Sequence, residues 1–174
     1  ALDKRLQTVM ISSPDPGEAK SIVLANLAVT LAQIEQRVIM VDCDLRRPRL
    51  HELFHLSNDL GLTTVMLDDQ ALSAPPLQDT GVAGLQLLAS GPLPPRPADL
   101  LGSQRMERVL ERLLADADLV ILDAPPVMAV TDAVVLATKV DGVLLVVSAG
   151  TTKRENAQQA VERLRKVNAR IVGS

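Results

Sequence analysis

Aromatic side chains are almost absent from this chain, which has one Phe, no Trp and no Tyr in 174 residues. Proteins that bind single-stranded nucleic acid stack the bases on aromatic rings, and the chain lacks such a platform. The formal net charge of −3 also leaves no basic excess to attract a polyanion. We therefore exclude nucleic acid as a partner and expect a core of aliphatic side chains.

Cysteine and long apolar runs are equally scarce. Cys43 is the only cysteine, so no internal disulfide can form, which is typical of a reducing compartment. No signal peptide opens the chain, and no apolar run reaches the ~20 residues that a membrane span needs. Strand-like runs lie close to both ends, so we expect residues 1–174 to be one domain excised from a longer protein.

The chain does have a regular alternation of apolar segments. Its hydrophobic fraction of 47% and charged fraction of 22% are those of a globular domain. Short β-branched runs, typical of strands buried on both faces, alternate with helical patterns. This order predicts an α/β fold, with a mostly parallel central sheet flanked by helices on both faces. We expect strands at residues 8–11, 38–41, 85–88, 119–122, 143–147 and 170–172, and helices at 20–36, 97–114, 131–140 and 152–167.

Residues 56–96 interrupt this alternation. They carry Pro75-Pro76, several glycines and a second proline-rich run that ends at Pro95. Their apolar residues are too few for a core of their own. We interpret the segment as surface insertions around one short strand and not as a second domain.

The loop after the first expected strand has the composition of a phosphate cradle. It runs from Ser12 and ends with Lys20-Ser21 where a helix begins. Backbone N–H groups at a helix N-terminus hold a phosphate, a lysine reaches its outer oxygens, and a hydroxyl binds Mg²⁺. The loop resembles the P-loop pattern G-x-x-x-x-G-K-[ST], with Pro14 and Ala19 in place of the two glycines. We predict a P-loop NTPase whose nucleotide contacts are Asp15, Pro16, Gly17, Glu18, Ala19, Lys20, Ser21 and Ile22.

Three aspartates follow two of the expected strands. Asp42 and Asp44 come after residues 38–41, and Asp123 comes after residues 119–122. The carboxyl ends of parallel strands meet at one edge of a sheet, where ligands bind. Mg²⁺ prefers carboxylate oxygens, and an aspartate near a γ-phosphate can accept a proton from an attacking hydroxyl. The acids favour a Mg·ATP site over a loop that only turns and caps a helix.

Longer stretches resemble the cytoplasmic domain of bacterial protein-tyrosine kinases (BY-kinases), which regulate capsule and exopolysaccharide polymerisation and chain length. The matching segments are the P-loop, D-x-D-L-R-R-P at residues 42–48, G-P-x-P-P-x-P at 91–97 and D-x-P-P-V at 123–127. The resemblance covers nearly the whole chain. It implies a protein-tyrosine kinase that uses ATP and Mg²⁺ and releases ADP.

The same resemblance implies roles for individual residues and for partners. The catalytic residues would be Asp42, Asp44 and Lys20, and the metal ligands Ser21, Asp42 and Asp123. Arg46 and Arg47 would stabilise phosphate charge or contact a neighbouring subunit, unless they are solvated surface residues. The implied location is the cytoplasm at the inner face of the cell membrane. The implied partners are a membrane polysaccharide co-polymerase or activator segment, fused or separate, the tyrosine-rich tail of a neighbouring subunit or another protein substrate, and further copies of the chain in a homo-oligomer.

The sequence departs from the family at a few positions. Ala19, Ile22 and Arg96 stand where the family usually has Gly, a small polar residue and Asn. Because the chain has no tyrosine, its acceptor tyrosine must lie on another chain. Two other functions stay open. One is a nucleotide-gated scaffold for polysaccharide chain-length control that transfers no phosphate. The other is a MinD/ParA-type ATPase, although such proteins have a second lysine where this chain has Asp15.

Two smaller features favour structural roles. His51 and His55 lie one helical turn apart without a clear third ligand, so we expect a polar helix face and not a metal site. Cys43 lies between two acids, which raise the pKa of a thiol and make it unreactive.

Overall fold

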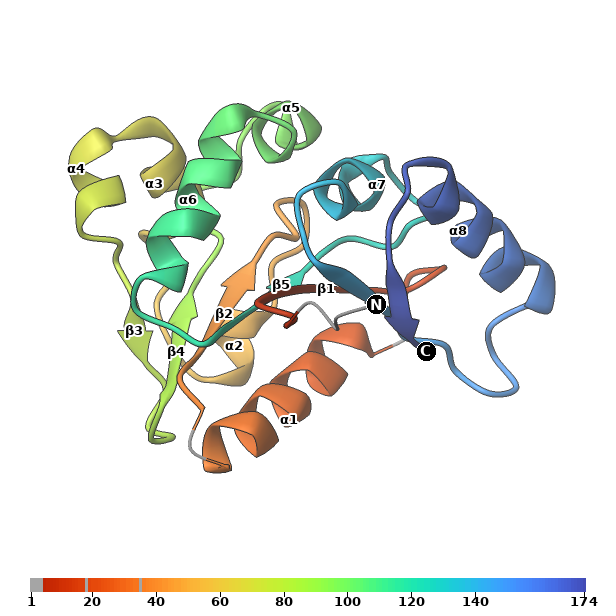
Figure 1. The fold of residues 1–174 in the computed structure, drawn as a ribbon, viewed down its shortest axis with the longest axis horizontal. Coiled ribbons are helices and arrows are strands. Elements are labelled where there is room, and N and C mark those ends of the chain that lie inside the picture. The colour runs from red at the N-terminus through yellow and green to blue at the C-terminus, as the bar shows by residue number, and fades with distance from the viewer. Residues whose placement is uncertain (1–4, 18, 35) are drawn as a thin grey trace.

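The computed structural model describes residues 5–17, 19–34 and 36–174. Within these residues a seven-stranded sheet has the order β3-β4-β2-β5-β1-β6-β7 (Figure 1). Neighbouring strands are parallel except for β3, which runs antiparallel to β4. The strands are β1 (Thr8–Ser12), β2 (Val38–Asp42), β3 (Gln78–Asp79), β4 (Leu85–Leu88), β5 (Leu119–Asp123), β6 (Gly142–Leu145) and β7 (Ile171–Gly173).

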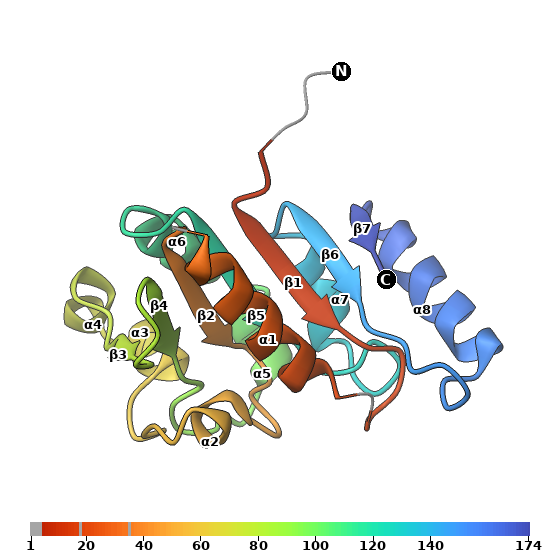
Figure 2. The same ribbon diagram turned by 90° about the horizontal axis from the view of Figure 1, so that it is seen from below.

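Helices cover both faces of the sheet, as predicted. They are α1 (Lys20–Gln33), α2 (Leu50–Leu53), α3 (Leu62–Leu67), α4 (Asp69–Ser73), α5 (Pro97–Leu101), α6 (Gln104–Leu114), α7 (Asp132–Ala137) and α8 (Arg154–Lys166). Helix α1 lies against one face (Figure 2), and α3 to α8 lie on the other. In the described part of the chain, no helix is both long enough and apolar enough to cross a membrane.

Alternate residues of the central strands supply two separate cores. On β5, Val120 and Leu122 pack under α6, whereas Leu119 and Ile121 pack on the α1 face. Side chains of a strand point alternately to opposite faces, so a strand between two helical layers must be apolar throughout. This requirement explains why the strands of the centre were visible in the sequence as unbroken apolar runs.

Three expectations from the sequence need correction. The helix expected at residues 97–114 is two helices, α5 and α6, separated at Gly102-Ser103. The Ser103 hydroxyl donates to the Leu100 carbonyl oxygen at 2.7 Å, which satisfies an acceptor where α5 ends. The strand expected at 143–147 ends at Leu145 as β6. The shorter α7 and α8 begin and end inside their expected ranges.

The third correction concerns residues 56–96. This segment contains α3, α4 and the antiparallel strand β3 as well as the expected strand β4. Leu62, Val65 and Met66 of α3 are buried in the core beneath α6. The segment therefore completes the core of the same domain instead of lying on its surface.

Strand register brings the polar ends of three strands together. Asp42, at the end of β2, lies beside Asp123, at the end of β5. Ser12 ends β1, the next strand, and the chain then enters the P-loop. The strands alone therefore place the Ser12 hydroxyl and the carboxylates of Asp42 and Asp123 at one edge of the sheet.

The two-core packing predicts which leucines carry stability. Replacing Leu122, which is fully buried in β5, by Ala should lower the free energy of unfolding by about 2–5 kcal/mol because a cavity remains. Leu67→Ala, at a side chain 79% exposed, is the matched control and should change it by less than about 0.5 kcal/mol. Urea denaturation of both variants measures the difference, and equal losses would contradict the assigned packing.

Candidate active site

The loop between β1 and α1 makes two backbone reversals before the helix begins. Gly17 has φ of 82°, and Ala19 has φ of 56° and ψ of 30°, both in the left-handed region. A residue with a Cβ pays for this conformation with ~1–2 kcal/mol of steric strain. The reversal at Ala19 directs the N-terminus of α1, with its unpaired N–H groups and positive end of the helix dipole, at the site.

The segment after β5 holds this loop from the other side. The backbone N–H groups of Val127 and Met128 donate to the carbonyl oxygens of Ser13 and Pro14 at 2.8 and 3.1 Å. The Ser12 hydroxyl also donates to the Pro125 carbonyl oxygen at 2.7 Å. The D-A-P-P-V run is therefore a support for the P-loop.

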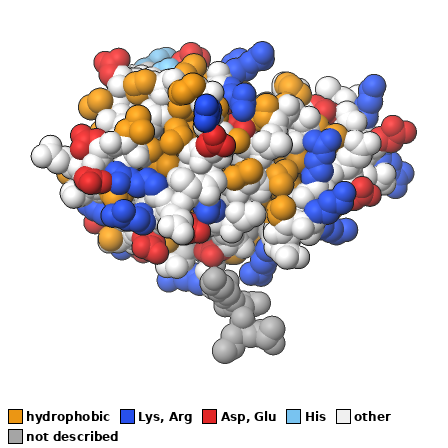
Figure 3. Space-filling view, turned by 90° about the horizontal axis from the view of Figure 1, so that it is seen from above, with side chains coloured by type: hydrophobic (Ala, Val, Ile, Leu, Met, Phe, Trp, Pro, Cys, Tyr) orange, Lys and Arg blue, Asp and Glu red, His pale blue; other side chains and the backbone are white. Residues whose placement is uncertain are grey.

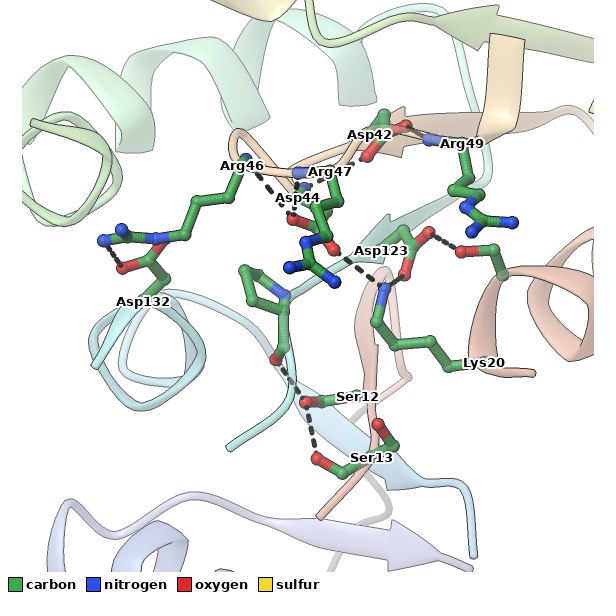
Figure 4. A network of polar contacts seen from close by, with 12 residues as sticks. Ser12, Ser13, Lys20, Asp42, Asp44, Arg46, Arg47, Arg49, Asp123 and Asp132 are labelled. Carbon is green, nitrogen blue, oxygen red and sulfur yellow. Dashed lines mark hydrogen bonds and ion pairs between the residues drawn. The ribbon is translucent and has the colours of Figure 1, made fainter. Parts of the chain in front are cut away.

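Lys20 and Ser21, in the first turn of α1, converge on Asp123. The Lys20 ammonium lies 2.8 Å from one Asp123 oxygen and 3.2 Å from Asp44 (Figure 4). The Ser21 hydroxyl donates to the other Asp123 oxygen at 2.6 Å. Both oxygens of Asp123 are thus bound by the two P-loop side chains expected to contact phosphate and Mg²⁺.

Asp42 organises the loop that follows β2. Its Oδ1 accepts from the backbone N–H of Asp44 at 3.0 Å. Its Oδ2 accepts from the N–H groups of Arg49 and Leu50 at 3.0 and 3.1 Å, where α2 begins. Asp44 repeats this pattern, because one of its oxygens accepts from the N–H of Arg47 at 3.0 Å. The two acids therefore shape the chain between β2 and α2, in addition to their predicted roles.

Burial and crowding shift the pKa values of this cluster. Burial, together with the nearby Asp123 carboxylate, raises the pKa of Asp42 to about 8, although the N–H groups of Leu50 and Asp44 act in the opposite direction. Burial also raises the pKa of Asp123, against the lowering effect of the Lys20 cation. For Lys20 burial lowers the pKa, but the two carboxylates outweigh it and the net pKa is raised. Lys20 therefore remains a cation at neutral pH.

Cys43 lies between the two acids and is fully buried. Burial, then the Asp42 carboxylate, raises its pKa well above the ordinary value. The thiol is an inward-packed strand-end side chain, as the sequence predicted.

The three arginines after Asp44 have different surroundings. Arg46 forms a bidentate pair with Asp132, a fully buried residue of α7, at 3.0 and 3.1 Å. This contact ties the loop after β2 to α7. The side chains of Arg47 and Arg49 extend from the loop after β2 toward the side of the site where Lys20 lies, away from Asp132 (Figure 4).

A cavity of about 340 Å³ lies over this cluster. Its walls are Ser13, Pro16, Gly17, Ala19, Lys20, Ser21, Ile22, Asp44, Arg47, Arg49, Leu53 and Pro126. Six of the eight residues predicted to contact nucleotide are among them. Of the remaining two, Asp15 accepts a hydrogen bond from Asn156 Nδ2 of α8 at 2.9 Å, and Glu18 lies outside the described residues.

The predicted acids are not equivalent with respect to this cavity. Asp44 lines it, whereas Asp42 and Asp123 are fully buried behind it. Among the described residues, no group of three or more His, Cys, Asp or Glu side chains is arranged to hold a metal ion. A cation here would need a hydroxyl or phosphate oxygen beside its carboxylates, and Mg²⁺ accepts such mixed oxygen ligands and water.

The sequence did not single out Arg49, Leu53 or Pro126 as members of the site. Arg49 and Leu53 arrive through α2, a four-residue helix. The helix face expected at His51 and His55 is only partly present, because α2 ends at Leu53 and His55 has a φ of 54°. Pro126 lies in the D-x-P-P-V motif at residues 123–127, of which only Asp123 is a predicted site residue.

A second cavity of about 700 Å³ lies between α3, α5 and the turn at residues 92–96. Figure 3 shows hydrophobic side chains gathered on this helical face of the molecule. Arg96, one of the departures from the family pattern, lines this cavity and not the one at the P-loop. That departure is therefore remote from the phosphate-binding residues.

Comparisons with known proteins agree with this fold and with the P-loop class of protein. The profile of the ParA family, described as NUBPL iron-transfer P-loop NTPase, matches residues 5–174. The tyrosine-protein kinase YwqD of Bacillus subtilis is 41% identical over 174 residues, covering 100% of this chain and 73% of that protein. The tyrosine-protein kinase etk of Escherichia coli K12 is 35% identical, over 95% of this chain and 23% of that protein.

Solved structures give the same result. The chimerical protein CapA2B2 superposes with a TM-score of 0.93 at 32% identity, covering 99% of this chain and 76% of that one. The kinase domain of the E. coli tyrosine kinase ETK gives 0.89 at 34% identity, over 97% and 66%. The septum site-determining protein MinD of Pyrococcus horikoshii gives 0.74 at 19% identity, over 95% and 68%, which establishes a shared fold alone.

The fold, the P-loop and the match to the ParA family profile together define a P-loop NTPase of the ParA class. Within that class the chain belongs to the bacterial tyrosine-protein kinase family, as its sequence motifs predicted. The MinD/ParA alternative shares the fold but has no relative of comparable identity among these matches.

The left-handed Ala19 leads to a prediction about stability. Ala19→Gly should raise the free energy of unfolding by roughly 0.5–1 kcal/mol, because relief of strain exceeds the added freedom of the unfolded chain. Ala25→Gly, inside α1, is the control and should lower it by about 1 kcal/mol. Opposite signs are expected in urea denaturation. Destabilisation by both changes would contradict the backbone assigned to Ala19.

The raised pKa values predict a pH dependence. An unfolded aspartate titrates near 3.9. Between that pH and about 8 the folded chain therefore binds more protons than the unfolded chain through Asp42. The raised pKa of Asp123 acts in the same direction. Stability should then fall as pH rises from 6 to 8 without Mg²⁺ or nucleotide.

Thermal melts across this window measure the effect. Asp42→Asn should reduce the slope of melting temperature against pH, whatever it does to the melting temperature itself. The window stops at pH 8 because above it the unfolded Cys43 thiol titrates too. A slope that is unchanged in the variant would refute the assignment to Asp42.

Proposed function

We propose that this domain transfers the γ-phosphate of ATP to a tyrosine hydroxyl of another chain, with Mg²⁺ as cofactor and ADP as product. The observation that carries the proposal is the convergence of Lys20 and Ser21 on Asp123, beside Asp44, in the cavity at the N-terminus of α1. The relatives YwqD and etk are named tyrosine-protein kinases.

The donor set fits a magnesium nucleotide. The N-terminus of α1 and the Lys20 cation suit phosphate oxygens. The residues that would hold Mg²⁺ are Ser21, Asp42 and Asp123, hard oxygen ligands that suit this ion, which would neutralise charge on the phosphates. In the present structure Lys20 and Ser21 bind Asp123 instead. A phosphate that takes over these two contacts would free both Asp123 oxygens.

Asp44 is placed to act on the acceptor. Its carboxylate borders the cavity, so it can take the proton of the tyrosine hydroxyl as the bond from that oxygen to the γ-phosphorus forms. The bond to the bridging oxygen of ADP breaks in the same displacement, and Lys20 balances the charge that develops on the phosphates. Asp42 holds the Asp44 loop through its three N–H contacts and so positions this base.

Membership of the family supports a proposal for the biological setting. We place the domain in the cytoplasm at the inner face of the membrane, where it would regulate capsule or exopolysaccharide polymerisation and chain length. Its partners would be a membrane co-polymerase or activator segment, fused or separate, and a tyrosine-bearing tail of a neighbouring subunit or another protein substrate. Homo-oligomers would bring such a tail to the site.

One observation favours a second function, a nucleotide-gated scaffold that transfers no phosphate. Ala19 lines the cavity and places a methyl group where the P-loop pattern has no side chain. The scaffold would bind Mg·ADP and Mg·ATP but leave an added tyrosine peptide unmodified, so the experiment below separates the two functions.

Removal of the Lys20 ammonium tests the nucleotide site. Lys20→Met should weaken Mg·ATP binding by at least ~100-fold and abolish phosphate transfer to a tyrosine-rich peptide, because the Lys20 ammonium is the P-loop cation in the first turn of α1. Lys139→Met, which breaks the remote pair with Glu107, is the matched control and should retain both activities. Calorimetry measures binding, and phosphotyrosine immunodetection measures transfer.

The chain offers a clean background for this assay because it has no tyrosine of its own. Any phosphotyrosine signal therefore belongs to the added peptide. Unchanged ATP affinity in a folded Lys20→Met protein would refute the site, and nucleotide binding without transfer by the unmodified chain would favour the scaffold.

A further inference from the structure

We propose that Arg47 and Arg49, with the apolar side chains of Ile22 and Leu53, form a docking subsite that selects acceptor tyrosines flanked by anionic side chains. The anions would be carboxylates or the phosphate of a neighbouring phosphotyrosine, which present the same oxyanion chemistry. This inference rests on the proposed function and specifies its substrate class.

The first observation is that, within the described part of the chain, both guanidinium groups are left without a partner. Among the described residues neither side chain forms a hydrogen bond or ion pair, and the bound N–H groups of Arg47 and Arg49 are those of the backbone, whereas the Arg46 side chain is held by Asp132. Arg47 and Arg49 are exposed but line the P-loop cavity. A guanidinium group that is unbound at the rim of a cavity can bind a carboxylate or a phosphate through two parallel N–H donors.

The second observation is that these arginines cannot move independently of the catalytic loop. Asp44 accepts the backbone N–H of Arg47 at 3.0 Å, and Asp42 accepts that of Arg49 at 3.0 Å. The proposed base and the two cations therefore belong to one hydrogen-bonded loop. Anions that bind the arginines would place a tyrosine between them within reach of Asp44.

The third observation is an apolar wall on the same rim. The side chain of Ile22 is 52% exposed and that of Leu53 is 39% exposed, and both line the cavity. Contact with aliphatic side chains gives a phosphate no favourable free energy, whereas burying an aromatic ring against them is favourable. While the backbone of Ile22 lies in the first turn of α1, its side chain is free to contact the ring of an incoming tyrosine.

Charge supports an anionic occupant. Among the described walls of the cavity, Lys20, Arg47 and Arg49 are cations and Asp44 is the one carboxylate. Lys20 is already neutralised by its contacts with Asp44 and Asp123. The excess positive charge therefore sits on Arg47 and Arg49, at the rim nearest to α2. Opposite charges on a partner would set its orientation and speed its association.

The experiment measures peptide selection. Four peptides share one acceptor tyrosine and differ in its flanks, which are glutamate, glutamine, lysine or a single phosphotyrosine. The unmodified chain should phosphorylate the glutamate peptide with kcat/KM about 5-fold or more above the glutamine peptide, and the lysine peptide least. The phosphotyrosine arm shows whether a phosphate serves as well as carboxylates.

Charge reversal supplies the critical comparison. Arg47→Glu with Arg49→Glu should abolish or invert this order of kcat/KM among the peptides when ATP is kept saturating for each variant. Arg47→Lys with Arg49→Lys should keep the same order of peptides with smaller differences, since lysine retains the positive charge but cannot form the bidentate contact of a guanidinium. Arg108→Glu with Arg165→Glu, at exposed positions of α6 and α8, is the control. It changes the net charge by the same amount and should preserve the order of the peptides.

The inference and the proposed function fail differently. Equal kcat/KM for all flanks, or loss of ATP affinity as the main effect of charge reversal, would overturn the inference and leave the kinase intact. If no peptide is phosphorylated, the proposed function fails. Anisotropy of labelled peptides on the Mg·AMP-PNP complex then decides the inference, which stands on preferential binding of the glutamate peptide and is overturned by its absence.

Discussion

Two carboxylates forced side by side at the ends of β2 and β5 are the constraint around which the site is built. Register places Asp42 beside Asp123, and both are fully buried. Such a pair is tolerable only if protons, cations or N–H groups compensate it. The chain supplies Lys20 and Ser21 to Asp123, and three backbone N–H groups to Asp42. The P-loop and the loop leading to α2 are therefore positioned by the same two acids.

The sequence predicts the centre of this fold better than its periphery. The strands that end in Asp42 and Asp123 are buried on both faces, so burial alone makes them continuous apolar runs. The break between α5 and α6 depends on Gly102 and Ser103, and the amphipathic pattern continues across it. Helix α3 has no clear signal in the sequence because it is only six residues long, too short to show a helical period, and its apolar residues are buried by packing beneath α6.

The site divides in the same way. Lys20, Ser21 and Asp44 could be predicted because a motif or a strand end fixes their place in the chain. Arg49 and Leu53 could not, because a contact with Asp42 seven residues away positions α2 and no local pattern encodes it. Asp15 was assigned to the nucleotide by its place in the motif, yet its carboxylate is held by Asn156 of α8, a contact between distant segments that no spacing reveals.

The three departures from the family pattern differ in how close they lie to the P-loop cavity. Arg96 lines the cavity near α3, away from the P-loop, so its replacement of Asn does not change the walls of the P-loop cavity. Ile22 contributes an exposed side chain at the rim of the P-loop cavity, where the proposed docking subsite would use it to contact the acceptor. Ala19 alone combines strained backbone with a place in the cavity wall. Because a left-handed Ala still lets α1 begin at Lys20, the phosphate-binding N-terminus survives, and any cost of the methyl group falls on how closely the phosphates approach it.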